Sequence, residues 1–197
     1  MSWIVQFIAE YHNNINLFFT FSFLGWIMEC LVIRREKGYF ENRGFVKGPF
    51  CIIYGFGASA AYFLMHRLTD YPILLYLFGA ASATMLEYFT ARLMLRLFGK
   101  FWWDYERKPF NYQGIICLES TVGWGFLALF IVRFLYDTLL NKIQMLPQSL
   151  GMSIAALLFT YYGVDFSLSL LKAIREIKGP GSGPKSPDAG RGTYDLV

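Results

Sequence analysis

Residues 72–95 read PILLYLFGAASATMLEYFTARLML, a run long and apolar enough to cross the hydrocarbon core of a membrane, for which about 20 apolar residues suffice. A single carboxylate, Glu87, lies inside this run, ahead of Arg92. An ionisable group within a membrane helix is costly and by default marks a functional site. The stretch therefore predicts a membrane helix that carries a polar site.

The rest of the chain has the same character. Hydrophobic residues make up 55% of the sequence and charged residues only 16%, which is too few charges to cover the core of a soluble domain of 197 residues. Four more segments qualify as spans: Ile15–Ile33, Pro49–Met65, Ile115–Tyr136 and Ser149–Leu171. We expect an all-α membrane bundle of about five transmembrane helices, formed by residues 14–178.

The two ends of the chain differ from this domain. Apolar residues recur at helical spacing in residues 1–13, which predicts a short amphipathic helix lying in the membrane interface. The start has neither a basic segment nor a small-residue cleavage site, so we expect no signal peptide. Residues 179–197 are rich in Gly, Pro and Ser and predict a disordered cytoplasmic tail.

Lysine and arginine predict the orientation. They gather in the first loop, in the third loop and after the last span, whereas the second loop has Arg67 alone and the fourth has Lys142. Because basic loops stay in the cytoplasm, we expect the N-terminus outside and the C-terminus in the cytoplasm. The net charge of +4 then reflects topology and contact with lipid headgroups, and we expect no nucleic-acid partner.

Three further acids resemble Glu87 in their position. Glu29, Glu119 and Asp165 also lie within apolar runs, and a rise of 1.5 Å per residue places all four roughly 7–11 Å inside the cytoplasmic boundary. Each shares a helix face with small or hydroxyl-bearing residues, which predicts a polar layer lining the bundle interior. The layer either binds a cation, a proton or a polar substrate, or it locks the loops by pairing with Arg34, Arg43, Arg92 or hydroxyl groups.

A two-helix unit recurs along the chain. Glu29 precedes Arg34 by the same interval as Glu87 precedes Arg92, and each helix is followed by a basic loop and a helix with a glycine pair. Asn42 and Asn111 lie ahead of the two returning helices. The pattern predicts a parallel repeat about an axis along the membrane normal. The alternative is that any two helical hairpins share such hydropathy.

Aromatic residues dominate the third loop, FWWDYERKPF at residues 101–110. Trp102 and Trp103 fit an interfacial aromatic belt. The sharper alternative is a re-entrant or lid segment in which Asp104, beside the two indoles, recognises a headgroup or a cation. The cysteines and histidines have no metal-ligand or disulfide spacing, and no phosphate-loop motif is present, so we expect neither a metal nor another cofactor.

Five motifs between about Phe18 and Gly125 support a resemblance: GWIMEC, NRGFVKGPF, IYGFGA, LEYFTARLMLRLFGKFWWDYERKPFN and GIICLE. They resemble the bacterial family of type IV ABC-transporter permeases. The resemblance implies a multi-pass permease of the bacterial cytoplasmic membrane that works with a separate ATPase. The implied positions are Glu29, Asn42, Arg43, Gly44, Gly48, Pro49, Tyr54, Gly55, Glu87, Trp102, Trp103, Asp104, Tyr105 and Asn111.

Three functions therefore stay open. The first is a permease-like transport protein, and five short spans predict that it forms a homo-oligomer or hetero-oligomer. The second is an intramembrane enzyme or binding protein for a lipid headgroup, and the third is an accessory subunit of a larger complex. We assign no catalytic residue. The candidate substrate-binding or ion-binding residues are Glu29, Glu87, Glu119, Asp165, Arg43, Arg92, Asn42, Asn111, Trp102, Trp103, Asp104 and Tyr54.

Overall fold

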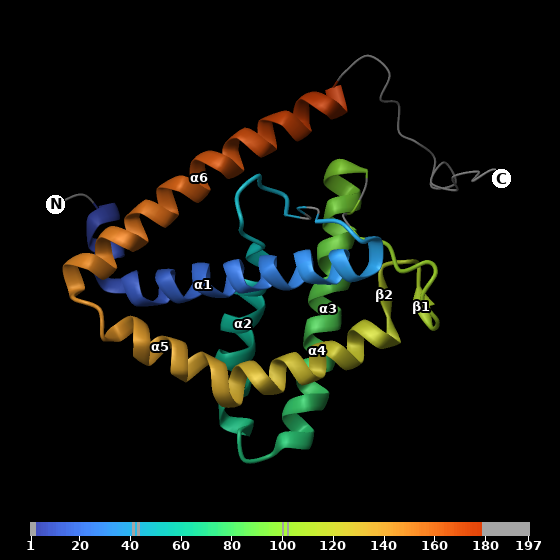
Figure 1. Ribbon diagram of the computed structural model, residues 1–197, viewed down its shortest axis with the longest axis horizontal. Helices are drawn as coiled ribbons and strands as arrows, with labels where there is room; N and C mark the ends of the chain where they lie inside the picture. The colour runs from blue at the N-terminus through green and yellow to red at the C-terminus, as the bar shows by residue number, and fades with distance from the viewer. Residues whose placement is uncertain (1–2, 41, 43, 100, 102, 179–197) are drawn as a thin grey trace.

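The computed structural model describes residues 3–40, 42, 44–99, 101 and 103–178 (Figure 1). Two candidate site residues, Arg43 and Trp102, and the expected disordered tail at 179–197 lie outside the described residues.

The described chain is almost entirely helical. Its elements, in order, are α1 (Trp3–Lys37), α2 (Ile52–Met65), a 3₁₀ turn (His66–Leu68), α3 (Pro72–Phe98), β1 (Asn111–Tyr112), β2 (Ile116–Cys117), α4 (Leu118–Phe130), a π-helical turn (Ile131–Leu135), α5 (Tyr136–Gln144) and α6 (Gln148–Lys178). The two short strands form an antiparallel hairpin. The all-α fold that the hydropathy pattern predicts is confirmed.

Four helices are long and apolar enough to cross a membrane: Gln6–Arg35, Pro72–Phe98, Leu118–Gln144 and Gln148–Arg175. The chain is therefore a multi-pass membrane protein. The expected fifth span, at Pro49–Met65, contains only the 14 residues of α2 in regular helix. At 1.5 Å per residue this helix alone is about 21 Å long, which is less than the roughly 30 Å of the hydrocarbon core. The chain nevertheless passes through α2 from one side of the bundle to the other, because the loop before α2 and the α2–α3 turn lie at opposite ends of it (Figure 1).

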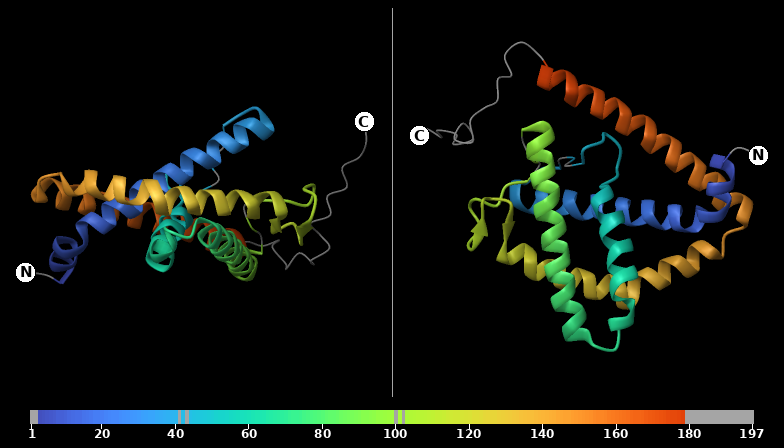
Figure 2. Two further views of the ribbon diagram at one scale, coloured as in Figure 1. Left: turned by 90° about the horizontal axis from the view of Figure 1, so that it is seen from below. Right: turned by 180° about the vertical axis from the view of Figure 1, so that it is seen from behind.

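The expected boundary after residue 13 is not a break in the helix. α1 continues through it as one element of 35 residues. Its first turns bend away from its long axis, at the dark-blue end of the chain (Figure 2). The location of this bent part in the membrane interface stays a prediction.

The helices alternate in direction, and they cross one another steeply. In Figure 1 α1 runs from left to right and α4 from right to left, α3 runs upward and α2 downward, and α6 rises from the left to the upper right. The loop after α1, the β1–β2 hairpin and the end of α6 consequently gather on one side of the molecule, and the α2–α3 and α5–α6 turns lie on the other (Figure 2). This arrangement agrees with the alternation of basic loops.

Small residues allow the closest helix crossings. A Cβ atom at Gly79 on α3 would overlap the Cβ atom of Ala128 on α4, and one at Gly55 on α2 would overlap the backbone and side chain of Phe18 and the side chain of Ser22 on α1. Glycine and alanine let two membrane helices approach until their backbones nearly touch. The α1–α2 and α3–α4 pairs are held together in this way.

The loop of residues 38–51 folds into the bundle. The Cys51 N–H donates to the Ser22 carbonyl at 3.0 Å, in the middle of α1. Val46 and Phe50 are buried and pack with Phe19 of α1, against side chains of α6. Irregular backbone is tolerated at such a depth only where protein covers it. This loop, and not only the helix α2 that follows it, thus fills the space between α1 and α6.

Candidate functional site

Glu87 is the most deeply buried carboxylate among the described residues, with 6% of its surface exposed. One carboxylate oxygen accepts a hydrogen bond from the Tyr105 hydroxyl at 2.9 Å. The other accepts from the Trp124 indole N–H at 3.0 Å and from the Ser120 hydroxyl at 3.5 Å. A buried carboxylate needs such donors because it has lost its water. Its donors come from α4 and from the third loop, so three segments converge on one side chain.

Glu29 lies in the same region. Its carboxylate accepts a hydrogen bond from the Tyr54 hydroxyl at 2.6 Å, which connects α1 to the first turn of α2. The Tyr54 ring lies 5.7 Å from the Trp124 ring, which in turn donates to Glu87. We call Glu29, Tyr54, Trp124, Glu87 and Tyr105 the carboxylate cluster. It joins α1, α2, α3, α4 and the third loop.

A precisely folded loop positions Tyr105. The Asn111 amide donates to the carbonyls of Glu106 and Lys108 at 3.0 and 2.9 Å, and its oxygen accepts from the Gly114 N–H at 3.2 Å. The Tyr105 N–H donates to the Gly114 carbonyl at 2.9 Å. These bonds fix the loop around the β1–β2 hairpin. Asn111 is therefore a structural residue of the turn, although sequence reasoning made it a binding candidate.

Trp103 and Asp104 also stabilise this loop from within. The Trp103 indole donates to the Ile115 carbonyl at 2.8 Å, and the Asp104 carboxylate accepts from the Glu106 N–H at 2.8 Å. Burial, assisted by the negative charge of Glu87, raises the pKa of the Tyr105 phenol well above its usual value. Tyr105 therefore stays protonated at neutral pH and serves as a donor.

Asp165 holds the first loop against α6. Its two oxygens accept from the backbone N–H groups of Gly48 at 2.7 Å and of Lys47 at 3.3 Å. Asn42 organises the same loop by donating to the carbonyls of Val46 at 3.2 Å and Lys47 at 3.0 Å. Asp165 therefore fits the second alternative, in which an acid of the predicted layer holds a loop in place. Its partners are backbone N–H groups.

Glu119 and Arg92 lie away from the cluster. The Glu119 side chain is 66% exposed and pairs with Lys108 at 3.0 Å. The prediction that Glu119 and Gly123 face the bundle interior is wrong, because Ser120 and Trp124 occupy the inward face of α4 and the Gly123 position is open. Arg92 is exposed, and it pairs with no carboxylate among the described residues.

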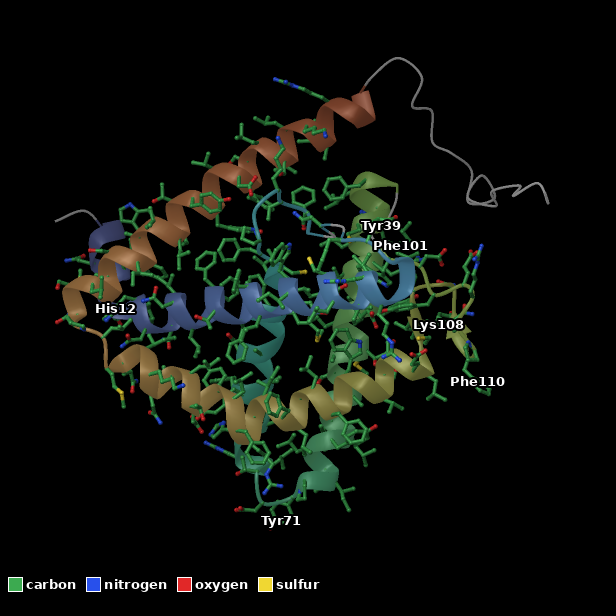
Figure 3. The ribbon with its side chains drawn as sticks, in the orientation of Figure 1. His12, Tyr39, Tyr71, Phe101, Lys108 and Phe110 are labelled. Atoms are coloured by element: carbon green, nitrogen blue, oxygen red, sulfur yellow. The ribbon has the colours of Figure 1, made fainter. Side chains whose placement is uncertain are left out.

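The partners of Glu87 on α4, Ser120 and Trp124, are the residues that sequence reasoning missed. They are spaced four apart, so they share one face of a helix, and this spacing was the available signal. Figure 3 shows the surroundings: Lys108 and Phe110 lie at the right edge of the view, just ahead of the hairpin, and Tyr71 lies at the bottom, in the turn between α2 and α3. Aromatic side chains at both ends fit two interfacial belts.

The arrangement around Glu87 suits a change of protonation or the binding of a polar ligand. Within the described ranges, no three His, Cys, Asp or Glu side chains converge in a way that would hold a metal ion. Glu87 is satisfied by neutral donors, two of which are hydroxyl groups that can rotate and accept instead. The cluster can therefore adapt to a change in the charge of Glu87.

Comparison with known proteins supplies the family. No curated protein matches the chain, and no solved structure matches it. A family model described as "Putative ABC-transporter type IV" matches residues 16–170, which run from within α1 into α6 and include the whole carboxylate cluster. The match covers well over half of the chain. The protein therefore belongs to the family of putative type IV ABC transporters.

Proposed function

We propose that the protein is the membrane permease subunit of a bacterial ABC-type transporter whose ATPase is a separate chain. Membership of the family supports an ATP-driven role, and the multi-pass helices support a role in the membrane. The N-terminus lies outside and the C-terminus in the cytoplasm. The loops that gather with the end of α6 then face the ATPase.

The hydrogen bond from Tyr105 to Glu87 is the observation that supports this function most directly. Tyr105 belongs to the third loop, which on this topology is exposed to a cytoplasmic partner. Glu87 lies buried between α3 and α4. A displacement of the third loop would therefore directly change the hydrogen bonding of the buried Glu87 carboxylate.

The carboxylate cluster then serves as the polar part of the transport path. Glu29 and Glu87 interact with a cation, a proton or a polar group of the substrate, and Tyr54 and Trp124 connect the two acids. Asp165 and Asn42 fix the first loop beside this path. Movement of the third loop alters the cluster when ATP is bound and hydrolysed.

Capture of the tagged full chain from its native membrane tests the proposal. Mass spectrometry of the bound proteins should find an ATPase in stoichiometric amount, and the reconstituted complex should hydrolyse ATP. Tyr105→Phe should leave the ATPase bound but reduce hydrolysis by roughly tenfold or more, because a hydrogen bond to a charged group contributes about 1.5–3 kcal/mol. The matched control is Tyr71→Phe, since Tyr71 is exposed at the opposite end.

Two substitutions of Glu87 separate function from folding. Glu87→Gln should keep the fold, because the amide can accept from Trp124 and donate to a rotated Tyr105 hydroxyl, but it should abolish coupled hydrolysis. Glu87→Leu leaves Trp124 without an acceptor and should also destabilise the bundle. Capture of a specific lipid with no ATPase, or full coupling in both Tyr105→Phe and Glu87→Gln, would overturn the proposal.

A further inference from the structure

A groove runs between α3 and the β1–β2 hairpin, away from the carboxylate cluster. It encloses about 420 Å³ and is lined by Thr84, Met85, Tyr88, Phe89, Tyr112 and Ile116. Met85 and Phe89 are 61% and 66% exposed, so the groove opens to the surroundings of the helix. In a membrane these surroundings are lipid tails.

Polar groups follow the groove in a fixed order along α3. Tyr88 and Tyr112 face each other with ring centroids 6.1 Å apart, and neither hydroxyl has a hydrogen-bond partner among the described residues. Arg92 and Arg96 come next. At 1.5 Å per residue they lie about 10 and 16 Å beyond Met85, toward the end of the helix.

The two arginines lie on the same stripe of α3 as the groove, because residues three, four, seven and eleven apart share a helix face. Both are exposed, and within the described part of the chain neither pairs with a carboxylate. Two guanidinium groups in the last turns of a membrane helix, with no carboxylate partner among the described residues, are complementary to an anion at headgroup depth. Guanidinium groups bind phosphate with two parallel hydrogen bonds.

We propose that this groove binds an anionic phospholipid. An acyl chain lies along Met85 and Phe89, the ester and glycerol oxygens meet the hydroxyls of Tyr88 and Tyr112, and the phosphate binds Arg92 and Arg96. Along α3 the sequence passes from Met85 through Tyr88 and Phe89 to Arg92 and Arg96, so the cations come at the end of the groove, as the phosphate comes at the end of the lipid. The site is separate from the carboxylate cluster and does not depend on the proposed transport function.

The first half of the chain has a corresponding groove, which gives an internal comparison. Four of its lining residues have the same sequence offsets from Glu29 as four lining residues of the α3 groove have from Glu87. They are Trp26, Ile27, Cys30 and Leu31, matching Thr84, Met85, Tyr88 and Phe89. The arginine that corresponds to Arg92 in the first half is Arg34. Its guanidinium group packs over the Phe40 ring, 4.7 Å from the ring centroid. We therefore assign the headgroup site to the α3 groove.

Native mass spectrometry of the purified full chain tests the site, with equal amounts of phosphatidylglycerol and phosphatidylcholine as probes. Wild type should retain phosphatidylglycerol preferentially. Arg92→Gln with Arg96→Gln should lower that preference roughly 30-fold, since each cation near the headgroups contributes about fivefold. Arg67→Gln with Lys142→Gln removes the same charge from the other end and should leave the preference unchanged.

Two more variants make the test independent of folding. Arg92→Lys with Arg96→Lys keeps the charge and should retain most of the preference. Met85→Trp fills the groove from an exposed position and should reduce retention of both lipids. An unchanged lipid ratio in the glutamine pair, an equal loss in the Arg67 and Lys142 pair, or displacement of the lipid by soluble glycerol phosphate would each overturn the proposal.

Discussion

Gly25 on α1 lies directly against the ring of Tyr54 on α2. A Cβ atom built at Gly25 would overlap the Cβ and Cγ atoms of Tyr54. The contact places the Tyr54 hydroxyl 2.6 Å from Glu29, which lies one turn further along the same helix. The absence of a side chain at Gly25 therefore determines where one half of the carboxylate cluster forms.

Gly25→Ala should weaken the α1–α2 contact, because the methyl group has to displace a buried ring. We expect a loss of about 1–3 kcal/mol, as is usual for overpacking a core. Thermal unfolding in detergent, followed by circular dichroism, measures it. Gly123→Ala is the matched control, since nothing lies within 4 Å of a Cβ atom there. Equal melting temperatures for the two variants would contradict the tight contact.

Asp165→Ala should release the first loop from α6. It removes the acceptor of the Gly48 and Lys47 N–H groups; Gly48 is buried, so its unpaired donor costs about 1–3 kcal/mol, whereas the exposed Lys47 N–H can bind water instead. Limited trypsin digestion should then cut after Lys47 much faster than in wild type. Asp70→Ala, in the exposed α2–α3 turn, should not change the digestion rate. Equal protection in the two variants would show that Asp165 does not hold the loop.

Alkaline pH should destabilise the fold in a way that depends on Tyr105. The pKa of its phenol is raised in the folded protein, by burial and by Glu87, above the value of about 10 in an unfolded chain. Its stabilising contribution is therefore complete below pH 10 and is lost as the pH rises above 10. Between pH 10 and 11, wild type should lose about 1 kcal/mol more stability than Tyr105→Phe, because the unfolded phenol is already half ionised at pH 10. Identical pH profiles would place the phenol in a solvated environment.

Cysteine labelling should reveal the orientation. Glu106→Cys lies in the third loop, and Met145→Cys, at a position that is 81% exposed, lies between α5 and α6. In intact cells a membrane-impermeant maleimide should label Met145→Cys, and it should label Glu106→Cys only after permeabilisation. The reverse pattern would invert the topology and would place the third loop out of reach of any cytoplasmic ATPase.

Hydropathy predicted the helices well because burial in lipid requires long apolar runs. It could not predict that the segment at Pro49–Met65 begins with irregular backbone, because an apolar loop buried by protein looks like a helix in composition. The small-residue spacing on α3 correctly indicated the buried face of Glu87. The same reasoning failed for Glu119, since a residue in the first turn of a helix can reach solvent and a loop cation.

The hydrogen-bond partners of Glu87 and Asp165 were harder to predict from the sequence than the helices were. Tyr105 reaches Glu87 only because Asn111 closes a turn around the hairpin, and Gly48 reaches Asp165 only because the first loop enters the bundle. Such contacts depend on loop conformations that no periodic pattern encodes. Arginines were the expected partners because charge is visible in a sequence, whereas backbone N–H groups are present at almost every position.

The hydrogen bonds between the first loop and Asp165 of α6 have a consequence for biosynthesis. Gly48 is made early and Asp165 late, so the ribosome has to deliver almost the whole chain before the loop can acquire its acceptor. Until then the N–H groups of Gly48 and Lys47 lack this acceptor, whereas the Cys51 N–H can already bond to Ser22 of α1. The first loop can therefore reach its final conformation only after α6 has been made and has entered the bundle.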